Sequence, residues 1–367
     1  MSARFHALAI GGLLLLWAAG LVAVTRWLPP AAASQGGGRA AIGTCAARPP
    51  TGTGVAARPG TFFRLEPRLD AAGTLIGQRL TVGRNGVGSG TADLGAGSAA
   101  TGPTEGIVTM VDDDGTSSRI DLVATAGHCA ITVYTSTDVV RRAILDPADG
   151  SVLLHLVARA DRSDLGVWRV GPGETSARRV VEPLPAALGL GRVWATDLGL
   201  DAAGQHLAVQ SCLDLQCLTR IVDLGASTSA PRVIRGSEQG PMIGFSGGLL
   251  VTWAACDGFP CPVLAWDPVG GTEARTLIGD ASAAALTGDA RLLVVTESNE
   301  DGERTLALDP ASLASVTLHG LRAGERPLGN AAAQSQGVEV DASGIAVGTA
   351  AGATRLIHVT AGGEVLP

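Results

Sequence analysis

Short apolar runs separated by turn residues recur along most of the chain. Residues 207–209 lead through a short turn to residues 219–223, and residues 250–252 lead likewise to residues 263–267. These runs are rich in β-branched and aliphatic side chains and lack the 3.6-residue periodicity of amphipathic helices, which favours β-strands. We therefore expect strand–turn–strand hairpins over most of the chain.

The same pattern returns at residues 152–169, 292–309 and 345–360. In the second of these, Asp301-Gly302 is a strong hairpin-turn signal, because glycine readily takes the positive φ that such turns require. The ends of the five returning strands follow one another at intervals of 42 to 54 residues. A period of about 40–50 residues made of short strands is typical of four-stranded propeller blades.

An Asp-x-x-Gly turn precedes two of these hairpins, at residues 201–204 and 341–344. This opening resembles the inner strands of WD40-like and TolB-like β-propellers, and the resemblance covers residues 61–367. It implies an all-β fold, a β-propeller of six or seven four-stranded blades. Apolar runs at 80–82 and 131–134 bring the count to about seven, and six blades closed by an N-terminal strand are the alternative.

The resemblance is partial, because no histidine start signature and no Trp-Asp ending recurs, although Trp266-Asp267 occurs once. The hairpins alone would also allow an array of β-sandwiches. Their regular spacing favours radial repetition. We expect Trp194, Trp253 and Trp266 to pack between blades, the usual place of a buried indole.

The N-terminal residues 1–28 carry the one strong helix signal. Residues 7–24 contain no charged or strongly polar side chain, and as a helix they would rise about 27 Å, close to the ~30 Å hydrocarbon core of a bilayer. We expect a single transmembrane helix; the alternative is a signal peptide cleaved near Ala31-Ala32-Ala33. Either predicts an extracytoplasmic chain, membrane-anchored or, after cleavage, secreted.

Residues 29–60 are rich in Pro, Ala and Gly and are expected to be a flexible tether before the propeller domain at 61–367. Six cysteines agree with export. Two pairs each enclose four residues: Cys212 with Cys217, and Cys256 with Cys261.

The two close cysteine pairs could in principle hold zinc together, but they fall in separate hairpins, and paired thiols outside the cytoplasm form disulfides by default. We therefore expect two local disulfides. Cys45 and Cys129 remain. A bridge between them would pin the tether to the domain, and the sequence leaves their pairing open.

One constellation requires comparison with an enzyme. Thr125-Ala-Gly-His128-Cys129 resembles the histidine motif of trypsin-like serine proteases, and Gly244-Phe-Ser246-Gly-Gly248 resembles their serine motif, with Asp164 between them. The resemblance implies that Ser246 attacks, His128 takes its proton and Asp164 orients the imidazole.

Three departures speak against that protease. Phe245 replaces the acidic residue before the serine, no cysteine precedes His128 at short range, and the hairpin repeat continues after Ser246. In a propeller, Ser246-Gly-Gly248 is a turn into the next strand and His128 lies at a strand start. We therefore predict no catalytic residues and keep His128, Asp164 and Ser246 as the alternative.

The net charge and the spacing of possible ligand residues limit which partners and cofactors the chain is expected to bind. The net charge is −7 with no lysine, which argues against nucleic acid, since phosphate binding needs a concentrated basic surface. We interpret Arg141-Arg142 and Arg178-Arg179 as ordinary solvated cations. Acidic runs at 111–115 and 297–302 lack EF-hand spacing and are interpreted as exposed turns, and the scattered histidines predict no metal or cofactor.

The expected function follows from the fold's common use, the rigid display of loops. We expect a membrane-tethered binding or scaffold module for a protein, peptide or cell-envelope glycan ligand. The alternative is an extracytoplasmic hydrolase or lyase with a site at the propeller channel, of which the trypsin-like protease is one version. Titratable side chains converging at the channel would favour the enzyme.

Overall fold

The computed structural model divides the chain into two compact units, Met1–Gly38 and Arg39–Pro367. The residues it describes all lie in the second unit: 40–46, 61–84, 87–104, 106–125, 128–184, 195–213, 216–225, 231–234, 239–270, 273–299, 302–329, 340–341, 344–360 and 362–366. The predicted helix at 7–24 and most of the predicted tether lie outside them. No helix in this described part of the chain has the length and apolarity that a membrane crossing requires.

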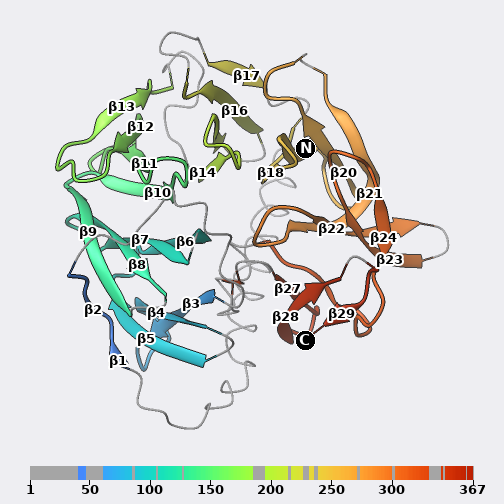
Figure 1. The fold of residues 1–367 in the computed structure, drawn as a ribbon, viewed down its shortest axis with the longest axis horizontal. Coiled ribbons are helices and arrows are strands. Elements are labelled where there is room, and N and C mark those ends of the chain that lie inside the picture. Colours follow the sequence, from blue (N-terminus) through green and yellow to red (C-terminus); the bar gives the residue numbers. More distant parts are fainter. Residues whose placement is uncertain are drawn as a thin grey trace, which may run out of the picture. The chain divides into compact units, whose positions relative to one another are not determined.

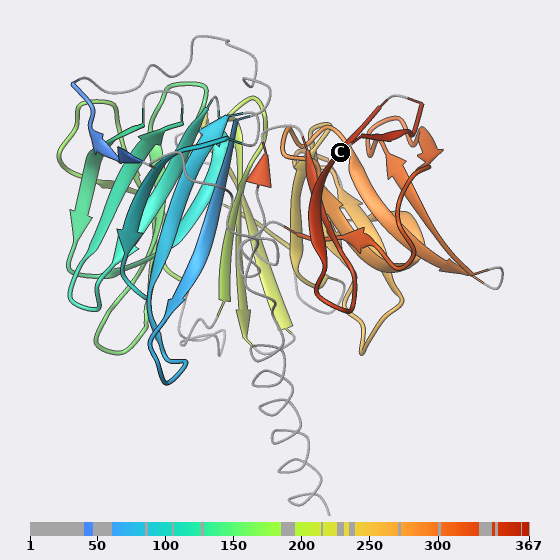
Figure 2. The ribbon, with the colours of Figure 1, turned by 90° about the horizontal axis from the view of Figure 1, so that it is seen from below.

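The described residues form strands and no helix, which confirms the all-β prediction for this part of the chain. Six sheets surround a common axis (Figure 1). Figure 2 shows their strands running side by side along that axis. The first sheet, in the order β1-β5-β4-β3-β26, consists of β1 (Ala40–Ala41), β3 (Thr61–Leu69), β4 (Leu75–Arg84), β5 (Val87–Leu94) and β26 (Val340–Asp341).

The next three sheets follow the chain. The second, in the order β2-β9-β8-β7-β6, contains β2 (Gly43–Thr44), β6 (Ala99–Thr104), β7 (Ile107–Asp113), β8 (Ser118–Ala124) and β9 (Cys129–Ser136). The third contains β10 (Val139–Leu145), β11 (Val152–Val157), β12 (Asp164–Val170) and β13 (Arg178–Val181). The fourth contains β14 (Ala195–Leu200), β15 (His206–Leu213), β16 (Gln216–Asp223) and β17 (Arg232–Ile234).

The last two sheets differ in size. A seven-stranded sheet contains β18 (Met242–Ser246), β19 (Leu249–Trp253), β20 (Cys261–Trp266), β21 (Arg275–Leu286), β22 (Leu293–Asn299), β23 (Gly302–Leu308) and β24 (Ser315–Thr317). The final sheet, in the order β25-β27-β28-β29, contains β25 (Arg326–Pro327), β27 (Ile345–Gly348), β28 (Thr354–Val359) and β29 (Val365–Leu366).

The blade count differs from the prediction. Five of the sheets are blades of four or five strands, and the remainder is one continuous seven-stranded sheet, so six or seven separate four-stranded blades is wrong. The reason is β21, which has 12 residues. Its first half pairs with β20 and its second half with β22, so no turn separates the two hairpins into different sheets.

Apolar cores lie between neighbouring sheets. The alternation of inward and outward side chains gives each sheet two apolar faces, and a ring of sheets buries both. Trp266, for example, is fully buried among residues of the fourth and seven-stranded sheets, as predicted. Ala346 of β27 belongs to the core of the first two sheets, so the last sheet packs against the first.

The ring is also closed by hydrogen bonding. The chain leaves the final sheet between β25 and β27, and β26 pairs antiparallel with β3, placing Val340 opposite Phe63. β26 is thus the edge strand of the first sheet, although roughly 270 residues separate it from β3. This closure by a C-terminal strand was not predicted.

The predicted hairpins and disulfides are confirmed. The strands around 207–223, 250–266, 292–308 and 345–359 pair as antiparallel neighbours. The structure contains the two local disulfides and, in addition, the bridge from Cys45 to Cys129. Three disulfides indicate an oxidising, extracytoplasmic compartment.

Candidate functional site

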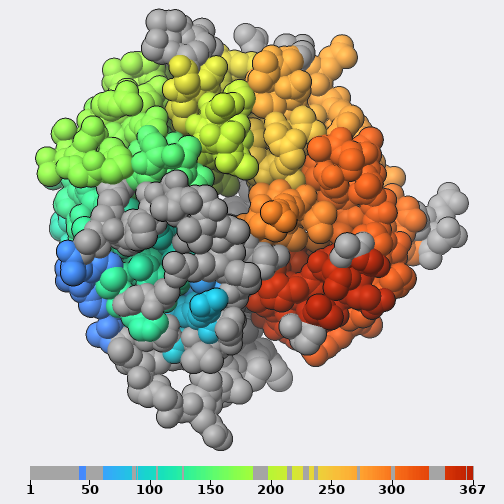
Figure 3. Space-filling model, in the orientation of Figure 1, coloured from blue at the N-terminus to red at the C-terminus, as the bar shows by residue number. Residues whose placement is uncertain are grey.

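A cavity of about 260 Å³ lies where several sheets approach one another near the axis. Its walls come from β6, β10, β14, β18, β19 and β21, so segments far apart in the sequence meet there. Figure 3 shows the hollow near the centre of this face, between the yellow-green atoms of the fourth sheet and the orange atoms of the seven-stranded sheet. Its lining combines polar groups with apolar side chains, the latter including Ile144, Leu198, Met242, Trp253 and Leu286.

Two oppositely charged side chains face each other in this cavity. Arg142 of β10 and Asp197 of β14 form an ion pair with 3.4 Å between Nε and Oδ1, and their side chains are 23% and 43% exposed. Asp197 also accepts a hydrogen bond from the amide of Leu198 at 3.0 Å. Surrounding protein walls raise the pKa of Asp197, although Arg142 and this amide oppose the shift.

A β-bulge positions the arginine. The pairing of β10 with β11 slips between Val140 and Arg142, so Arg141 is an extra residue without a direct partner across the ladder, and Arg142 stands opposite His155. A bulge re-aims the side chains on its strand. Arg142 therefore reaches the cavity, while burial and then the charge of Arg162 lower the pKa of Arg141.

The bulge corrects one interpretation of the sequence. Arg141-Arg142 was expected to be a pair of solvated cations, but Arg142 is three-quarters buried and ion-paired inside the cavity. A pair of arginines at a strand start carries no local signal of this role. Asp197 is equally unmarked in the sequence. The two meet because neighbouring sheets place β10 beside β14, which is a long-range property.

An aromatic pair extends the cavity wall outward. The rings of Trp253 and Phe259 meet edge to face, with 5.2 Å between centroids and an interplanar angle of 78°. Phe259 is 67% exposed and lies inside the loop closed by the Cys256–Cys261 disulfide. Trp253, predicted to pack between blades, both contacts a core and lines the cavity, whereas Trp194 lies outside the described residues.

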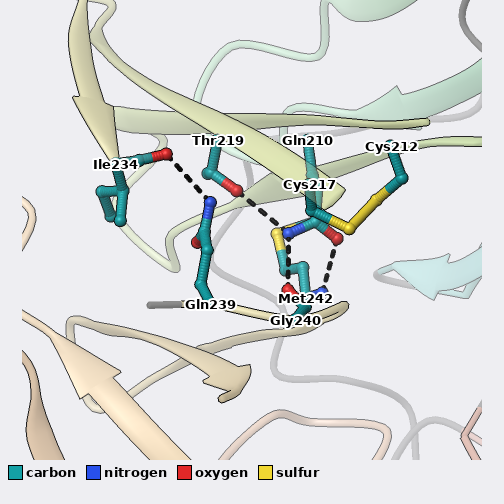
Figure 4. The surroundings of a disulfide bond; sticks show 8 residues. All are labelled: Gln210, Cys212, Cys217, Thr219, Ile234, Gln239, Gly240 and Met242. Carbon is teal, nitrogen blue, oxygen red and sulfur yellow. Dashed lines mark hydrogen bonds between the residues drawn. A yellow bond between two sulfur atoms is a disulfide. The ribbon is translucent and has the colours of Figure 1, made fainter. Parts of the chain in front are cut away.

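A buried glutamine holds the segment that supplies Met242 (Figure 4). Gln210 is 2% exposed, and its Oε1 accepts a hydrogen bond from the Met242 amide at 2.6 Å. Its Nε2 donates to the Thr219 hydroxyl at 3.0 Å and to the Gly240 carbonyl at 3.2 Å. The fourth sheet is thereby tied to the first strand of the seven-stranded sheet, directly beside the Cys212–Cys217 disulfide.

The three residues of the protease-like constellation are not brought together. His128 precedes β9, and its Nδ1 donates to the carbonyl of Thr125, 3.2 Å away. Ser246 ends β18, is 2% exposed, and donates to the carbonyl of Arg291 at 3.4 Å. Asp164 begins β12 on a third sheet, and its histidine partner is His155, at 2.8 Å.

Asp164 is the centre of a buried polar network. It accepts hydrogen bonds from His155 and from the amides of Leu184 and Gly166, and Arg220 of the fourth sheet lies 3.5 Å away. Burial alone would raise the pKa of Asp164. The hydrogen bond and charge of His155, together with the two amides, outweigh burial and hold the pKa below its usual range. The network connects two sheets.

The acidic run at 111–115 is also used within the protein. Asp113 bonds to Ser118 and, at 2.8 Å, to Arg159 in the turn between β11 and β12. Asp112 pairs with Arg119 at 3.0 Å. These carboxylates therefore connect strands and sheets. Of the second acidic run, Glu297 pairs with Arg304 across β22 and β23 at 2.7 Å.

Comparison with known proteins shows a likeness of fold. No family model matches the sequence, and no curated protein matches it. A solved prolyl endopeptidase superposes with a TM-score of 0.56 at 12% identity, covering 84% of this chain and 48% of its own. Prolyl oligopeptidase B from Galerina marginata gives 0.48 at 11% identity, covering 78% and 47%.

A further structure, from a nidogen/laminin complex, gives a TM-score of 0.39 at 12% identity and covers 71% of this chain and 94% of its own. This chain spans about half the length of the peptidases it matches. At such identities the likeness shows the fold alone. The ring of sheets and the first of these matches identify the described part of the chain as a β-propeller module.

Proposed function

We propose that this chain is a ligand-binding propeller whose ligand occupies the cavity between Arg142 and Asp197. The carrying observation is one opposite-charge pair that lines a cavity together with apolar side chains. A concavity in which a few charged or polar groups fix the orientation of a ligand beside apolar side chains is typical of a ligand site. Among the described lining residues, Arg142 and Asp197 are the ionisable ones, and no serine, cysteine or histidine nucleophile lines the cavity.

The proposal also covers where the module is located and how it is attached. The N-terminal segment tethers the module to a membrane, and the propeller presents the cavity to a ligand supplied by a protein, a peptide or the cell envelope. The three disulfides support an extracytoplasmic location.

Methionine offers a test that reports from inside the cavity. The chain has three methionines, of which Met242 lines the cavity and Met110 lies in a core at 2% exposure. Cells that make the full-length protein with photo-methionine are irradiated, and adducts are mapped by mass spectrometry. A ligand-derived mass on Met242, absent from Met110, supports the proposal.

The matched variants are Asp197→Asn, which removes the cavity anion, and Arg178→Gln, which removes an exposed cation of β13 and adds no methionine. The adduct should fall sharply in the first and persist in the second. Crosslinks from Met242 to its own walls alone, in all three proteins, would overturn the proposal.

A hydrolase or lyase is the second candidate, and the raised pKa of Asp197 favours it. A carboxyl group with an elevated pKa can act as a general acid or base near neutral pH. A mass on Met242 that matches only a hydrolysis or elimination product of a compound present in the cells, and not the intact compound, would indicate the enzyme. The trypsin-like alternative predicts fluorophosphonate labelling of Ser246. We expect none, because that side chain is buried and bonded to the Arg291 carbonyl.

A further inference from the structure

The charge pair in the cavity has unused bonding capacity. The 3.4 Å between Arg142 Nε and Asp197 Oδ1 exceeds the ~2.7–2.9 Å of a strong charge-assisted hydrogen bond. By contrast, both terminal nitrogens of Arg159 donate hydrogen bonds to the carboxylate of Asp113, at 3.2 and 2.8 Å. The Arg142–Asp197 pair is therefore loose, and it lies inside a cavity instead of in a packed interface.

Both side chains keep hydrogen-bonding capacity that is open to a ligand in the cavity. A guanidinium carries five N–H donors, and among the described residues Arg142 uses them only toward Asp197. An ionised carboxylate accepts at both oxygens. Oδ1 of Asp197 takes the Leu198 amide, and Oδ2 has no partner in the described part of the chain. The carboxylate of Asp197, which can bind a cation, and the guanidinium of Arg142, which can bind an anion, thus lie side by side.

The size and the walls of the cavity restrict the ligand further. A volume of about 260 Å³ holds roughly nine water-sized groups at ~30 Å³ each. That is the size of one medium amino acid. Beyond the charge pair the walls contain Thr101 and several apolar side chains, with Leu198, Met242 and Trp253 among them. The ligand therefore needs two adjacent opposite charges and a small apolar body.

We propose that the cavity binds a free α-amino acid with an apolar side chain. Its carboxylate lies against Arg142, its ammonium group against Asp197, and its side chain against Met242 and Trp253. The two charges of a zwitterion sit on one carbon, which matches the closeness of Arg142 and Asp197. The interior of a peptide carries neither charge, and a neutral sugar leaves both groups unpaired. This inference rests on the proposed binding function and names its ligand.

The test compares four probes on the full-length protein by isothermal titration. L-Leucine carries both charges and an apolar body, L-leucinamide lacks the carboxylate, N-acetyl-L-leucine lacks the ammonium group, and glycine lacks the body. We expect L-leucine to bind and each other probe to bind at least tenfold more weakly, because each lacks one of the three contacts and tenfold corresponds to about 1.4 kcal/mol, the size of one hydrogen bond to a charged group.

Variants of Arg142 and Asp197 test which side chain binds the carboxylate of the ligand and which binds its ammonium group. Arg142→Met should cost L-leucine at least tenfold and should abolish its advantage over L-leucinamide. Asp197→Asn should abolish its advantage over N-acetyl-L-leucine, and the exposed Arg178→Met should change nothing. The probe series on the unaltered chain needs no variant, so it decides the question even where a variant fails to fold.

Equal binding of the four probes, or no heat from any of the twenty amino acids at millimolar concentration, overturns this inference. The methionine adduct then separates the two proposals. An adduct on Met242 from another class of compound leaves the binding function standing and removes only the amino acid. No adduct and no heat remove both.

Discussion

Replacing Gln210 with methionine tests the contact that holds the cavity wall. Methionine fills nearly the same volume, so packing is largely kept. Three hydrogen bonds are lost, to the Met242 amide, the Thr219 hydroxyl and the Gly240 carbonyl. An unsatisfied buried donor costs about 1–3 kcal/mol, and each further bond contributes about 0.5–1.5 kcal/mol. The free energy of unfolding should therefore fall by about 2–6 kcal/mol.

Urea denaturation at pH 7 measures this loss, with Gln78→Met as the matched control. Gln78 also donates to a backbone carbonyl, that of Ser98 at 2.7 Å, but it is only partly buried, so water can replace the bond. We expect the control to lose less than about 1 kcal/mol. A loss of that small size in Gln210→Met as well would show that water satisfies the network and would refute the reasoning. Gln210→Met should also reduce the photo-adduct on Met242. The backbone amide that loses its hydrogen bond is that of Met242 itself, whose side chain lines the cavity.

Two further predictions concern stability. Because the pKa of Asp164 is held below its usual range, its contribution is complete above the unfolded value of about 3.9 and is lost as the pH falls through the folded value. Asp164→Asn should cost about 3–5 kcal/mol at pH 7 and flatten the acid limb of urea midpoints measured from pH 2 to 7; an unchanged limb would contradict this. Removing the Cys45–Cys129 bridge, which spans 84 residues, should cost about 4–5 kcal/mol, against about 2 kcal/mol for Cys212–Cys217, which spans five. Equal shifts in the thermal midpoints of the two paired Cys→Ser variants would refute the chain-entropy argument.

Much of the fold could be predicted because hairpins are local. Strand residues, turn residues and cysteine spacing lie within about 20 residues of one another, and the antiparallel pairs around 207–223 and 292–308 follow from them. The blade count could not be obtained in this way. Whether β21 is interrupted by a turn depends on pairing with two neighbours at once. Gly279, Asp280 and Ser282 stand at the changeover and would locally favour a turn, yet the strand continues through them.

The candidate site could not be predicted from the sequence either, because it too depends on long-range packing. Arg142 and Asp197 lie 55 positions apart and meet across two sheets. Motif resemblance misled at Asp164, whose neighbours in the fold are His155 and Arg220 instead of His128. A motif records spacing along the chain, whereas the partners of a buried carboxylate are chosen by the packing of sheets.

The pairing of β26 with β3 also constrains the order of assembly. Once β3 and β4 form the first hairpin, the other edge of β3 is exposed. Its partner strand, β26, is synthesised roughly 270 residues later. At about 5–20 residues per second of synthesis, that edge waits on the order of 10 to 50 seconds. An exposed edge with Phe62 and Phe63 is a template for wrong pairing with another chain during that time. Successful production of this protein therefore depends on shielding its first hairpin until the C-terminal segment arrives, and a chain truncated before residue 340 should aggregate through that edge.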